Sequence, residues 1–294
     1  MKAKIIDGKL IANQIKTELI QEIEKLEIRG FTPGLATVLV GEDPASNAYV
    51  RMKEKMCDEI GIQNFGYRLS GNTTENELLK LVDDLKNDHK VHGILVQLPL
   101  PKQINEQNVI NAIPVFKDVD GFHPTNWGKM MIGEESFLPC TPAGIQELLI
   151  RSGYSPENKN VVIVGRSKIV GLPLANILIQ KAPGANATVT VCHSKTQNLA
   201  EHTKRADILI AAIGIPEFIT ADMIAENSIV IDVGVNRVEA PEKKRGYRLV
   251  GDVNFEAVAK KAKAISPVPG GVGPMTIIML MRNTVKAMKM ANKL

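Results

Sequence analysis

The sequence predicts an α/β fold with two doubly wound domains around a cleft, the second of them a Rossmann-type nucleotide-binding domain. Three observations lead to this prediction. The chain has 294 residues, which exceeds the usual size of a single domain. Short apolar runs alternate with amphipathic segments in both halves, and a polar, turn-rich stretch at 114–139 separates the halves. Strands that alternate with helices favour parallel pairing, with helices covering both faces of each sheet.

The first half, 1–138, begins with a helix. Apolar residues recur every three or four positions from Lys9 to Arg29, as one face of a helix requires, and Gly30 ends the pattern. Short β-prone runs bounded by turn residues follow, each with a helical segment behind it. The expected strands are 35–40, 65–69 and 93–98, and the expected helices are 46–60, 75–86 and 106–112.

The second half, 139–274, repeats this alternation after a connecting helix at 141–151. The expected strands are 160–165, 187–192, 206–214 and 228–234, with a helix at 171–181. The apolar run 277–281 belongs to a C-terminal helix, 275–294, which is expected to pack back on the first domain. We therefore expect the domain boundary at 138/139, with the C-terminal helix returning to the first domain.

Composition and charge exclude several classes of partner. The net charge of +4 comes from 36 basic and 32 acidic residues without a long basic run, and aromatic residues make up only 4%, so no nucleic-acid partner is expected. No apolar stretch reaches the roughly 18 residues of a membrane span, so no membrane partner is expected either. The cysteines Cys57, Cys140 and Cys192 lack metal-ligand spacing. Because the N-terminus also lacks the apolar core of a signal peptide, we expect a reduced, cytoplasmic protein without a metal site.

A loop rich in proline and glycine precedes the C-terminal helix. It runs from Ser266 to Thr276 and reads Ser-Pro-Val-Pro-Gly-Gly-Val-Gly-Pro-Met-Thr. Proline fixes φ and removes N–H donors, whereas glycine allows a close approach of the backbone, so the loop predicts a stiff wall beside a ligand. A simple bend between a strand and a helix is the alternative.

A second glycine loop, Gly165 to Gly171, follows a strand and opens a helix. Backbone N–H groups and the helix dipole at such a position can hold a phosphate. The loop is not a strict G-x-G-x-x-G, because Ser167 stands where the second glycine belongs. An ordinary strand-to-helix loop can also carry glycine at both ends, which is the alternative interpretation.

The end of the next strand indicates which nucleotide binds there. NAD sites usually place a carboxylate at this position to receive the ribose hydroxyl. Here the chain reads Cys192-His193-Ser194-Lys195, so no carboxylate would repel a phosphate, and Ser194, Lys195 and Arg166 could bind one. The sequence therefore predicts NADP over NAD, with a solvated turn as the alternative.

The first half carries candidates for chemistry. Tyr49 and Lys53 are four residues apart on a predicted helix and share a face, although a charged helix face in water is the plainer interpretation. Gln97 interrupts an apolar strand near its carboxyl end, where ligands bind, or serves only as a hydrogen-bonding residue of the core. Asp118 and Asp120 could accept hydrogen bonds from a basic heterocycle, or belong to an Asp-Gly turn. No Ser-His-Asp order, HExxH or Walker motif is present.

Taken together, several segments closely resemble the bifunctional methylenetetrahydrofolate dehydrogenase/methenyltetrahydrofolate cyclohydrolase family, over nearly the entire chain. The segments are Ser46–Lys53, Gly93–Pro101, Lys117–Gly121, Pro139–Gly144, Gly165–Gly171 and Pro267–Thr276. The resemblance implies that NADP takes hydride from methylenetetrahydrofolate to leave a methenyl cation. Water then adds to that cation and opens the ring to give formyltetrahydrofolate, with both reactions in one cleft.

The resemblance also implies roles for individual residues. Lys53 is the key catalytic residue, Gln97 holds its geometry, and Tyr49 packs against the folate. Substrate contacts fall on Tyr49, Asp120, Pro269, Gly270 and Gly271, and cofactor contacts on Gly165, Arg166, Ser167, Gly171, Ser194 and Ile215. A folate substrate and a homodimer formed through the NADP-binding domain are the implied partners. Two rival interpretations are a shikimate-type dehydrogenase, which would lack the Lys53 and Gln97 combination, and a non-catalytic nucleotide sensor.

Overall fold

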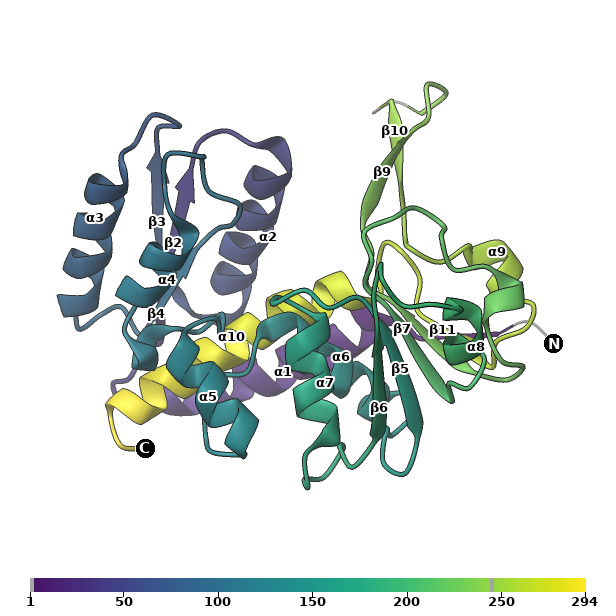
Figure 1. Cartoon of the computed structure of the whole chain (residues 1–294). Helices are drawn as coiled ribbons and strands as arrows, with labels where there is room; N and C mark the ends of the chain where they lie inside the picture. The colour runs from purple at the N-terminus through teal and green to yellow at the C-terminus, as the bar shows by residue number, and fades with distance from the viewer. Residues whose placement is uncertain (1–2, 244–245) are drawn as a thin grey trace. The chain divides into compact units, whose positions relative to one another are not determined.

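The computed structural model describes residues 3–243 and 246–294 (Figure 1). The chain forms two compact units. Unit 1 consists of Met1–Asn13 and Thr141–Thr276, and unit 2 consists of Gln14–Cys140 and Ile277–Leu294. The divisions between the units therefore fall inside helix α1 (Gly8–Glu27) and helix α10 (Val272–Ala291), and beside the first residue of helix α6 (Cys140–Arg151).

Unit 1 is built on a parallel sheet whose order is β1-β11-β8-β7-β5-β6, as traced in the described residues. Its strands are β1 (Lys4–Ile5), β5 (Asn160–Val164), β6 (Thr188–Cys192), β7 (Ile208–Ala211), β8 (Ile229–Asp232) and β11 (Ala264–Ile265). The strands β7 and β8 are buried throughout, as apolar strands covered on both faces must be. The strand β1 thus belongs to this sheet, although the sequence analysis assigned 1–138 to the other half.

The order of the strands locates the binding edge of unit 1. From β5 the chain proceeds to β6 on one side and then to β7 on the other, so the direction of winding reverses at β5. Ligands of such sheets bind at this reversal, outside the carboxyl ends of the strands. The helices of the unit are α6, α7 (Gly171–Ile179), α8 (Leu199–Thr203), α9 (Phe255–Val258) and the short η2 (Ala221–Met223). The loops after β5, β6 and β7 are therefore the expected ligand contacts.

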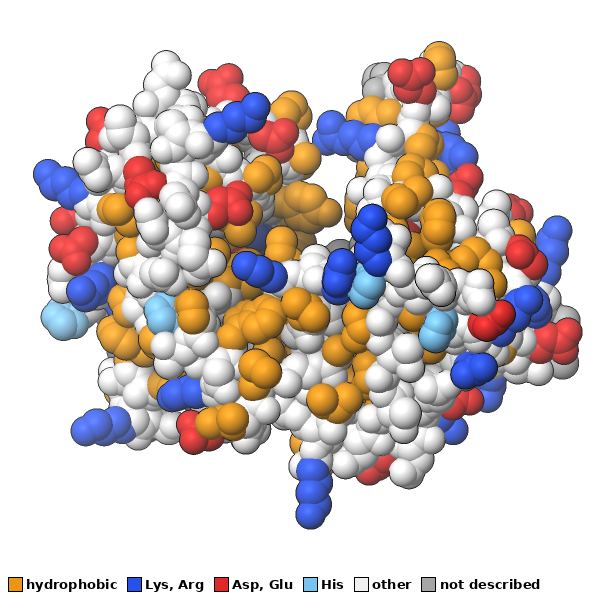
Figure 2. Space-filling model, in the orientation of Figure 1, with side chains coloured by type: hydrophobic (Ala, Val, Ile, Leu, Met, Phe, Trp, Pro, Cys, Tyr) orange, Lys and Arg blue, Asp and Glu red, His pale blue; other side chains and the backbone are white. Residues whose placement is uncertain are grey.

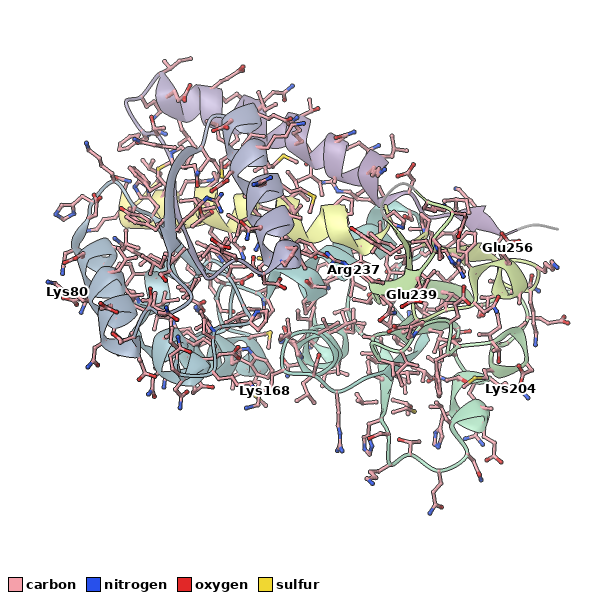
Figure 3. The ribbon with its side chains drawn as sticks, turned by 90° about the horizontal axis from the view of Figure 1, so that it is seen from above. Lys80, Lys168, Lys204, Arg237, Glu239 and Glu256 are labelled. Atoms are coloured by element: carbon pink, nitrogen blue, oxygen red, sulfur yellow. The ribbon has the colours of Figure 1, made fainter. Side chains whose placement is uncertain are left out.

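An antiparallel hairpin, β9 (Asn236–Glu239) and β10 (Tyr247–Val250), adds to unit 1 and was not predicted. Arg237 and Glu239 are exposed on β9 (Figure 3). The Arg237 guanidinium lies 4.9 Å from the centre of the Tyr247 ring. The strands are short and rich in charge, so no apolar run marks them. Cation–π stacking and backbone pairing, which a single-sequence pattern does not reveal, hold the hairpin together.

Unit 2 contains a parallel sheet in the order β3-β2-β4 among its described residues. Its strands are β2 (Gly34–Val40), β3 (Gln63–Leu69) and β4 (Gly93–Val96), and its helices are α2 (Pro44–Ile60), α3 (Glu75–Asn87), α4 (Glu106–Ala112), η1 (Val115–Lys117) and α5 (Pro124–Ile132), with most of α1 and α10. All seven residues of β2 are buried, which fits its central place. Since β3 and β4 lie on opposite sides of β2, the winding of this sheet also reverses, and the predicted α/β class of two domains with parallel sheets is confirmed.

Helix α5 lies in the stretch that the sequence analysis described only as polar and rich in turns. Its signals are present in the sequence: Pro124 occupies the first turn, where its missing N–H costs nothing, and Gly133 ends the helix at φ +77°. Met130 is buried, whereas Met131 and Ile132 are exposed. The sequence analysis assigned no element to this stretch, so helix α5 adds to the prediction.

The start of α1 packs tightly against the Pro-Gly loop within unit 1. Lys9 N donates to Gly270 O at 3.2 Å, and a Cβ on Gly8 would lie 1.8 Å from Gly271 O. We therefore expect Gly8→Ala to lower the free energy of unfolding by about 2–3 kcal/mol, since backbone would have to move. Thermal or urea unfolding measures this. Gly128→Ala is the matched control, because open space surrounds Gly128 within α5, and an unchanged stability of Gly8→Ala would contradict the packing.

Candidate functional site

Lys53 lies on the buried face of α2. That face is formed by Ser46, Val50, Lys53, Cys57 and Ile60, whose spacing follows the helical period. Only 7% of Lys53 is exposed, whereas its neighbours Arg51 and Lys55 face water. The interpretation of Lys53 as part of a solvated charged face is therefore wrong for this residue, because it takes a position of the inward stripe.

Gln97 provides the polar partner of this lysine. The Lys53 ammonium donates to Gln97 Oε1 at 3.0 Å, and Gln97 Nε2 donates to Leu98 O at 2.6 Å. The backbone of Gln97 extends the strand pairing of β4, since its N–H donates to Val38 O at 2.9 Å. Both ends of the amide are therefore fixed, and its oxygen is directed at the lysine. A buried cation needs such a partner.

Asp120 lies near enough to the same lysine for the charge of Lys53 to affect its pKa. Desolvation raises the pKa of the Asp120 carboxyl, while the positive charge of Lys53 and the neighbouring Cys140 side chain lower it. Burial raises the pKa of the Cys140 thiol well above its ordinary value, so this group stays protonated and donates. Asp120 also borders a cavity of about 20 Å³, which is large enough for about one water molecule.

Asp118, in contrast, is occupied by its own turn. Its buried carboxylate accepts from Phe122 N at 3.1 Å, His123 N at 2.8 Å and Asn126 Nδ2 at 2.8 Å. Desolvation raises the pKa of Asp118 to about 6 despite these donors. The carboxylate of Asp118 is therefore committed to shaping its own segment.

Two further residues hold this segment and were missed in the sequence. The Cys140 thiol donates to Val119 O at 3.3 Å, and Asn283 Nδ2 donates to the same oxygen at 2.8 Å and to Leu138 O at 3.1 Å. Cys140 stands in the Pro139–Gly144 segment, which marked the region but not the residue. Asn283 had no distinct signal, because Arg282 and Thr284 on either side of it are also polar.

Tyr49 lies one helical turn before Lys53 and remains accessible. Its side chain is 36% exposed. An aromatic ring at such a position offers a stacking surface, and the phenol can find a partner in water or in a ligand. The structure thus brings Lys53, Gln97 and Asp120 together within unit 2, with Tyr49 on the same helix as the lysine.

The glycine loop of unit 1 is closely packed at the carboxyl end of β5. Gly165 has φ +133°, and a Cβ there would lie 2.1 Å from Ala212 O, while a Cβ on Gly171 would lie 2.0 Å from Gly165 O. Ser167 Oγ accepts from Val170 N at 3.1 Å and steadies the entry to α7. The loop therefore requires its glycines, because a side chain at Gly165 or Gly171 would collide with backbone.

The turn after β6 presents a cation and a hydroxyl beside this loop. Gly165 N donates to Cys192 O at 2.8 Å, which places the two strand ends side by side. His193 N donates to Thr196 Oγ1 at 2.9 Å, so the turn is held while Ser194 and Lys195 stay exposed. Figure 2 shows basic side chains gathered at this end of the strands. Such a turn favours a phosphate over a bare ribose hydroxyl.

The loops after β7 and β11 complete this edge of unit 1. Ile215 is 47% exposed, in the loop after β7. In the Pro-Gly loop, Gly271 N donates to Pro267 O at 2.8 Å, and Gly270 has φ +109°. The glycine cradle, the basic turn and these loops all meet the carboxyl ends of parallel strands, so the residues present fit a dinucleotide with an extra phosphate.

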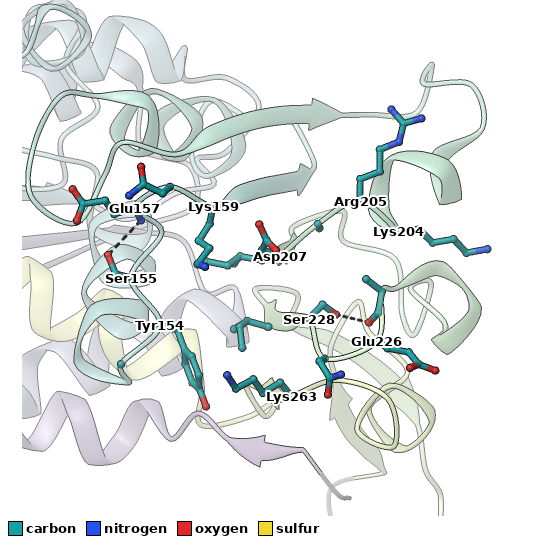
Figure 4. A pocket seen from close by; sticks show the side chains of 17 residues that line it. Tyr154, Ser155, Glu157, Lys159, Lys204, Arg205, Asp207, Glu226, Ser228 and Lys263 are labelled. Atoms are coloured by element: carbon teal, nitrogen blue, oxygen red, sulfur yellow. Dashed lines mark hydrogen bonds between the residues drawn. The ribbon is translucent and has the colours of Figure 1, made fainter.

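A separate hollow of unit 1 lies elsewhere. It has a volume of about 710 Å³ and is lined at the amino ends of β5, β7 and β8 by side chains such as Tyr154, Lys159, Asp207 and Lys263 (Figure 4). Because parallel sheets bind ligands at their carboxyl ends, we place the cofactor at the opposite edge. Within the described residues, no cluster of metal-ligating side chains is present, and no helix is long and apolar enough to cross a membrane.

Comparisons with known proteins match this architecture. The family model described as tetrahydrofolate dehydrogenase/cyclohydrolase, catalytic domain, matches residues 6–120, and that of the NAD(P)-binding domain matches residues 139–292. Bifunctional protein FolD of Dehalococcoides mccartyi (strain CBDB1) is 59% identical over 99% of this chain and 98% of its own length. The FolD protein of Acetivibrio thermocellus is 54% identical over the full length of both chains.

Solved structures agree with these matches. The FolD crystal structure from Campylobacter jejuni is 47% identical, with a TM-score of 0.92 over 99% of this chain and 100% of that one. The Trypanosoma brucei enzyme, solved with NADP and an inhibitor, is 39% identical, with a TM-score of 0.94 over the whole of both chains. Shikimate 5-dehydrogenase of Thermus thermophilus, at 16% identity and a TM-score of 0.51 over 88% and 94% of the two chains, shares the fold alone. The chain belongs to the tetrahydrofolate dehydrogenase/cyclohydrolase family.

Proposed function

We propose that the protein oxidises 5,10-methylenetetrahydrofolate to 5,10-methenyltetrahydrofolate with NADP and then hydrolyses the product to 10-formyltetrahydrofolate. The observation that carries the proposal is the buried Lys53–Gln97 pair beside Asp120, on a chain whose other unit has a glycine-cradled nucleotide edge. A non-catalytic nucleotide sensor would gain nothing from burying a lysine, which costs free energy unless the group is used or paired.

Lys53 carries the hydrolytic step. The oxygen of water bonds to the methenyl carbon while a first proton leaves that water. The bond from this carbon to N5 then breaks as N5 takes up a proton and the added hydroxyl loses its own, so a neutral formyl group remains on N10 and one proton is released overall. Lys53 is the group that accepts and returns the proton, and Gln97 holds its amine through the 3.0 Å hydrogen bond. General acid–base groups held in this way typically contribute about 10²–10⁴-fold to a rate.

Asp120 anchors the substrate in this proposal. A carboxylate accepts only, and the pterin ring offers neighbouring amino and ring N–H donors, so the two can pair through parallel hydrogen bonds. Tyr49 packs on the folate from α2. Pro269, Gly270 and Gly271 form a backbone wall against which the folate lies, since no side chain larger than a proline ring intervenes.

The cofactor edge of unit 1 positions NADP, which accepts the hydride when bound. Gly165, Ser167 and Gly171 cradle the pyrophosphate at the start of α7, and Ile215 borders the nicotinamide. Arg166, Ser194 and Lys195 bind the 2′-phosphate. The lone pair of a folate nitrogen drives the hydride out, so these residues act by positioning rather than by proton transfer.

The assay that tests the function compares cofactors. With methylenetetrahydrofolate, we expect kcat/KM with NADP to exceed that with NAD at least about 10-fold, because each charge-assisted bond to the phosphate contributes about 1.5–3 kcal/mol. Ser194→Asp should reverse this preference, whereas Lys159→Glu, at the opposite end of the strands, should leave it unchanged. No reduction of either cofactor with this substrate would refute the function, and a clear preference for NAD would refute the phosphate site alone.

A homodimer through unit 1 remains a prediction of the resemblance, and a cytoplasmic location remains a prediction from the composition of the sequence. The family relation supports the first, because oligomers of soluble enzymes are commonly symmetric dimers. Light scattering of the purified protein measures its mass in solution, and a mass of one chain at micromolar concentration would contradict the dimer.

A further inference from the structure

Two buried carboxylates that the proposed chemistry does not use lie at the carboxyl edge of unit 1. Asp232 ends β8 with 3% of its surface exposed, and Asp252 follows β10 with 0% exposed. Neither forms an ion pair with any residue in 3–243 or 246–294. Desolvation raises the pKa of Asp232 to about 7, and the charge of Asp252 contributes to the rise. Burying two carboxylates costs free energy, and the hydrogen bonds that Asp232 and Asp252 accept offset this cost.

Asp252 holds the loop after β7. Its Oδ2 accepts from Ile213 N at 2.6 Å and from Gly214 N at 2.9 Å, and its Oδ1 accepts from Asn236 Nδ2 at 2.9 Å. The two backbone donors directly precede Ile215. The carboxylate therefore takes the place of a backbone partner for this loop and fixes the direction in which Ile215 leaves the sheet.

Asp232 connects Asp252 to the Pro-Gly loop. Its Oδ1 accepts from Asp252 N at 2.9 Å and its Oδ2 from Val253 N at 3.0 Å, which holds the backbone of Asp252 in place. The N–H of Asp232 donates to Ser266 Oγ at 2.8 Å. Ser266 is the first residue of the Pro-Gly loop, and a Cβ on Gly271 would lie 2.9 Å from its Cβ. One buried cluster thus reaches from the loop after β7 to the Pro-Gly loop.

Glycines give this cluster its space. A Cβ on Gly234 would lie 2.1 Å from Asp252 Oδ1, and a Cβ on Gly251 would lie 1.8 Å from Asp232 Oδ2. Neither glycine has a positive φ, so the backbone conformation does not require glycine at these positions. The lack of a side chain is what the positions require, because the carboxylates occupy that space. The close packing leaves the carboxylates little freedom of movement.

We propose that Asp252, supported by Asp232, is a positioning residue that keeps the Ile213–Ile215 loop in register with the Pro-Gly loop and so sets the geometry of hydride transfer. This inference rests on the proposed function, which assigns Ile215 to the nicotinamide and Gly270 and Gly271 to the folate. Ring opening by water depends on Lys53 and Gln97 instead. The two activities should therefore respond differently when the cluster is disturbed.

The test uses Asp252→Asn in the full-length protein. The asparagine amide has one oxygen and one NH₂ group where the carboxylate has two oxygens. In either orientation the NH₂ group therefore faces an N–H donor, either the backbone amides of the loop after β7 or the Asn236 side chain, and that hydrogen bond is lost. We expect dehydrogenase kcat to fall at least about 10-fold, while hydrolysis of added methenyltetrahydrofolate, assayed without NADP, changes less than about 3-fold. Hydrogen exchange of the Ile213 and Gly214 amides should accelerate without cofactor, and the Kd for NADP should rise.

Controls separate positioning from general instability. Asp222→Asn alters an exposed carboxylate of the same unit and should change neither activity. The double variant D252N/N236D exchanges donor and acceptor and should restore part of the dehydrogenase rate, because the amide at position 252 can then donate to the carboxylate at position 236. If Asp252→Asn does not fold, Asn236→Leu removes one donor to the same carboxylate. This variant should also lower the dehydrogenase rate while leaving the hydrolysis of methenyltetrahydrofolate nearly unchanged.

Equal losses of the dehydrogenase and hydrolysis activities in Asp252→Asn would overturn the inference. So would an unchanged ratio of the two activities together with unchanged hydrogen exchange of the Ile213 and Gly214 amides. Failure of the proposed function has a different signature, since the unmodified protein would then reduce no NADP with methylenetetrahydrofolate. The exchange measurement needs no turnover, so it tests the anchoring of the loop in either case.

Discussion

Lys53→Met abolishes cyclohydrolase activity, with an expected loss of about 10²–10⁴-fold in kcat, and leaves the Kd for NADP nearly unchanged. Methionine suits the site because the side chain lies on the buried stripe of α2 and a thioether fills the same space. The amine is removed without opening a cavity. The conversion of methenyltetrahydrofolate to its formyl product, followed spectrophotometrically, measures the loss.

The control lies two residues further along the helix. Lys55 has 77% of its side chain exposed and pairs with Glu59 at 3.6 Å, so Lys55→Met removes the same charge from the same helix without touching the site. Its activities should stay within about 2-fold of the unmodified protein. Undiminished ring opening in Lys53→Met would rule out Lys53 as the proton-transfer group, whatever happens to the dehydrogenase rate.

Asp120→Ala mainly weakens folate binding. If the carboxylate accepts two charge-assisted hydrogen bonds from the pterin, its loss should raise KM for folate by about 10²-fold or more, since each such bond contributes about 1.5–3 kcal/mol. The Kd for NADP should not change. Steady-state kinetics and isothermal titration with folate measure both, and Asp84→Ala, on the exposed face of α3, is the control. An unaltered KM would exclude Asp120 as the anchor.

The pH dependence of this binding follows from the pKa shift. Desolvation raises the pKa of Asp120, so the accepting carboxylate form is present above the raised value and is lost as the pH falls through it. KM for folate should therefore begin to rise at a higher pH than an ordinary aspartate, with a pKa of about 3.9, would cause. Asp120→Asn should remove this dependence. A profile identical in the two proteins would show that another group titrates.

The sequence predicted the fold well where local signals and the global pattern agree. Helix α4 occupies the range expected for it, and β2, β3 and β4 fall within a few residues of theirs, because apolar runs bounded by turn residues determine them. The hairpin β9–β10 and helix α5 were missed, since neither has an apolar face longer than a few residues. Pairing across a hairpin and end signals on a short helix are weak in a single sequence.

The candidate site shows a similar division. Lys53 was singled out, but its charged neighbours Arg51 and Lys55 argued for water, and only the inward stripe of α2 shows that it is buried. Asp252 and its two backbone donors are separated by 38 and 39 positions, so no spacing rule connects them. Such anchors arise from tertiary structure alone. A polar residue at the end of an apolar strand, as in Ile229–Asp232, is the one local hint.

The division of the chain between the units has a consequence for biosynthesis. Unit 1 takes its first strand from the beginning of the chain, and unit 2 takes its last helical segment, Ile277–Leu294, from the end. Neither unit is a continuous piece of polypeptide. During synthesis from the N-terminus, Gln14–Cys140 therefore leaves the ribosome long before Ile277–Leu294 does. Unit 2 cannot complete its packing until this last segment has been made.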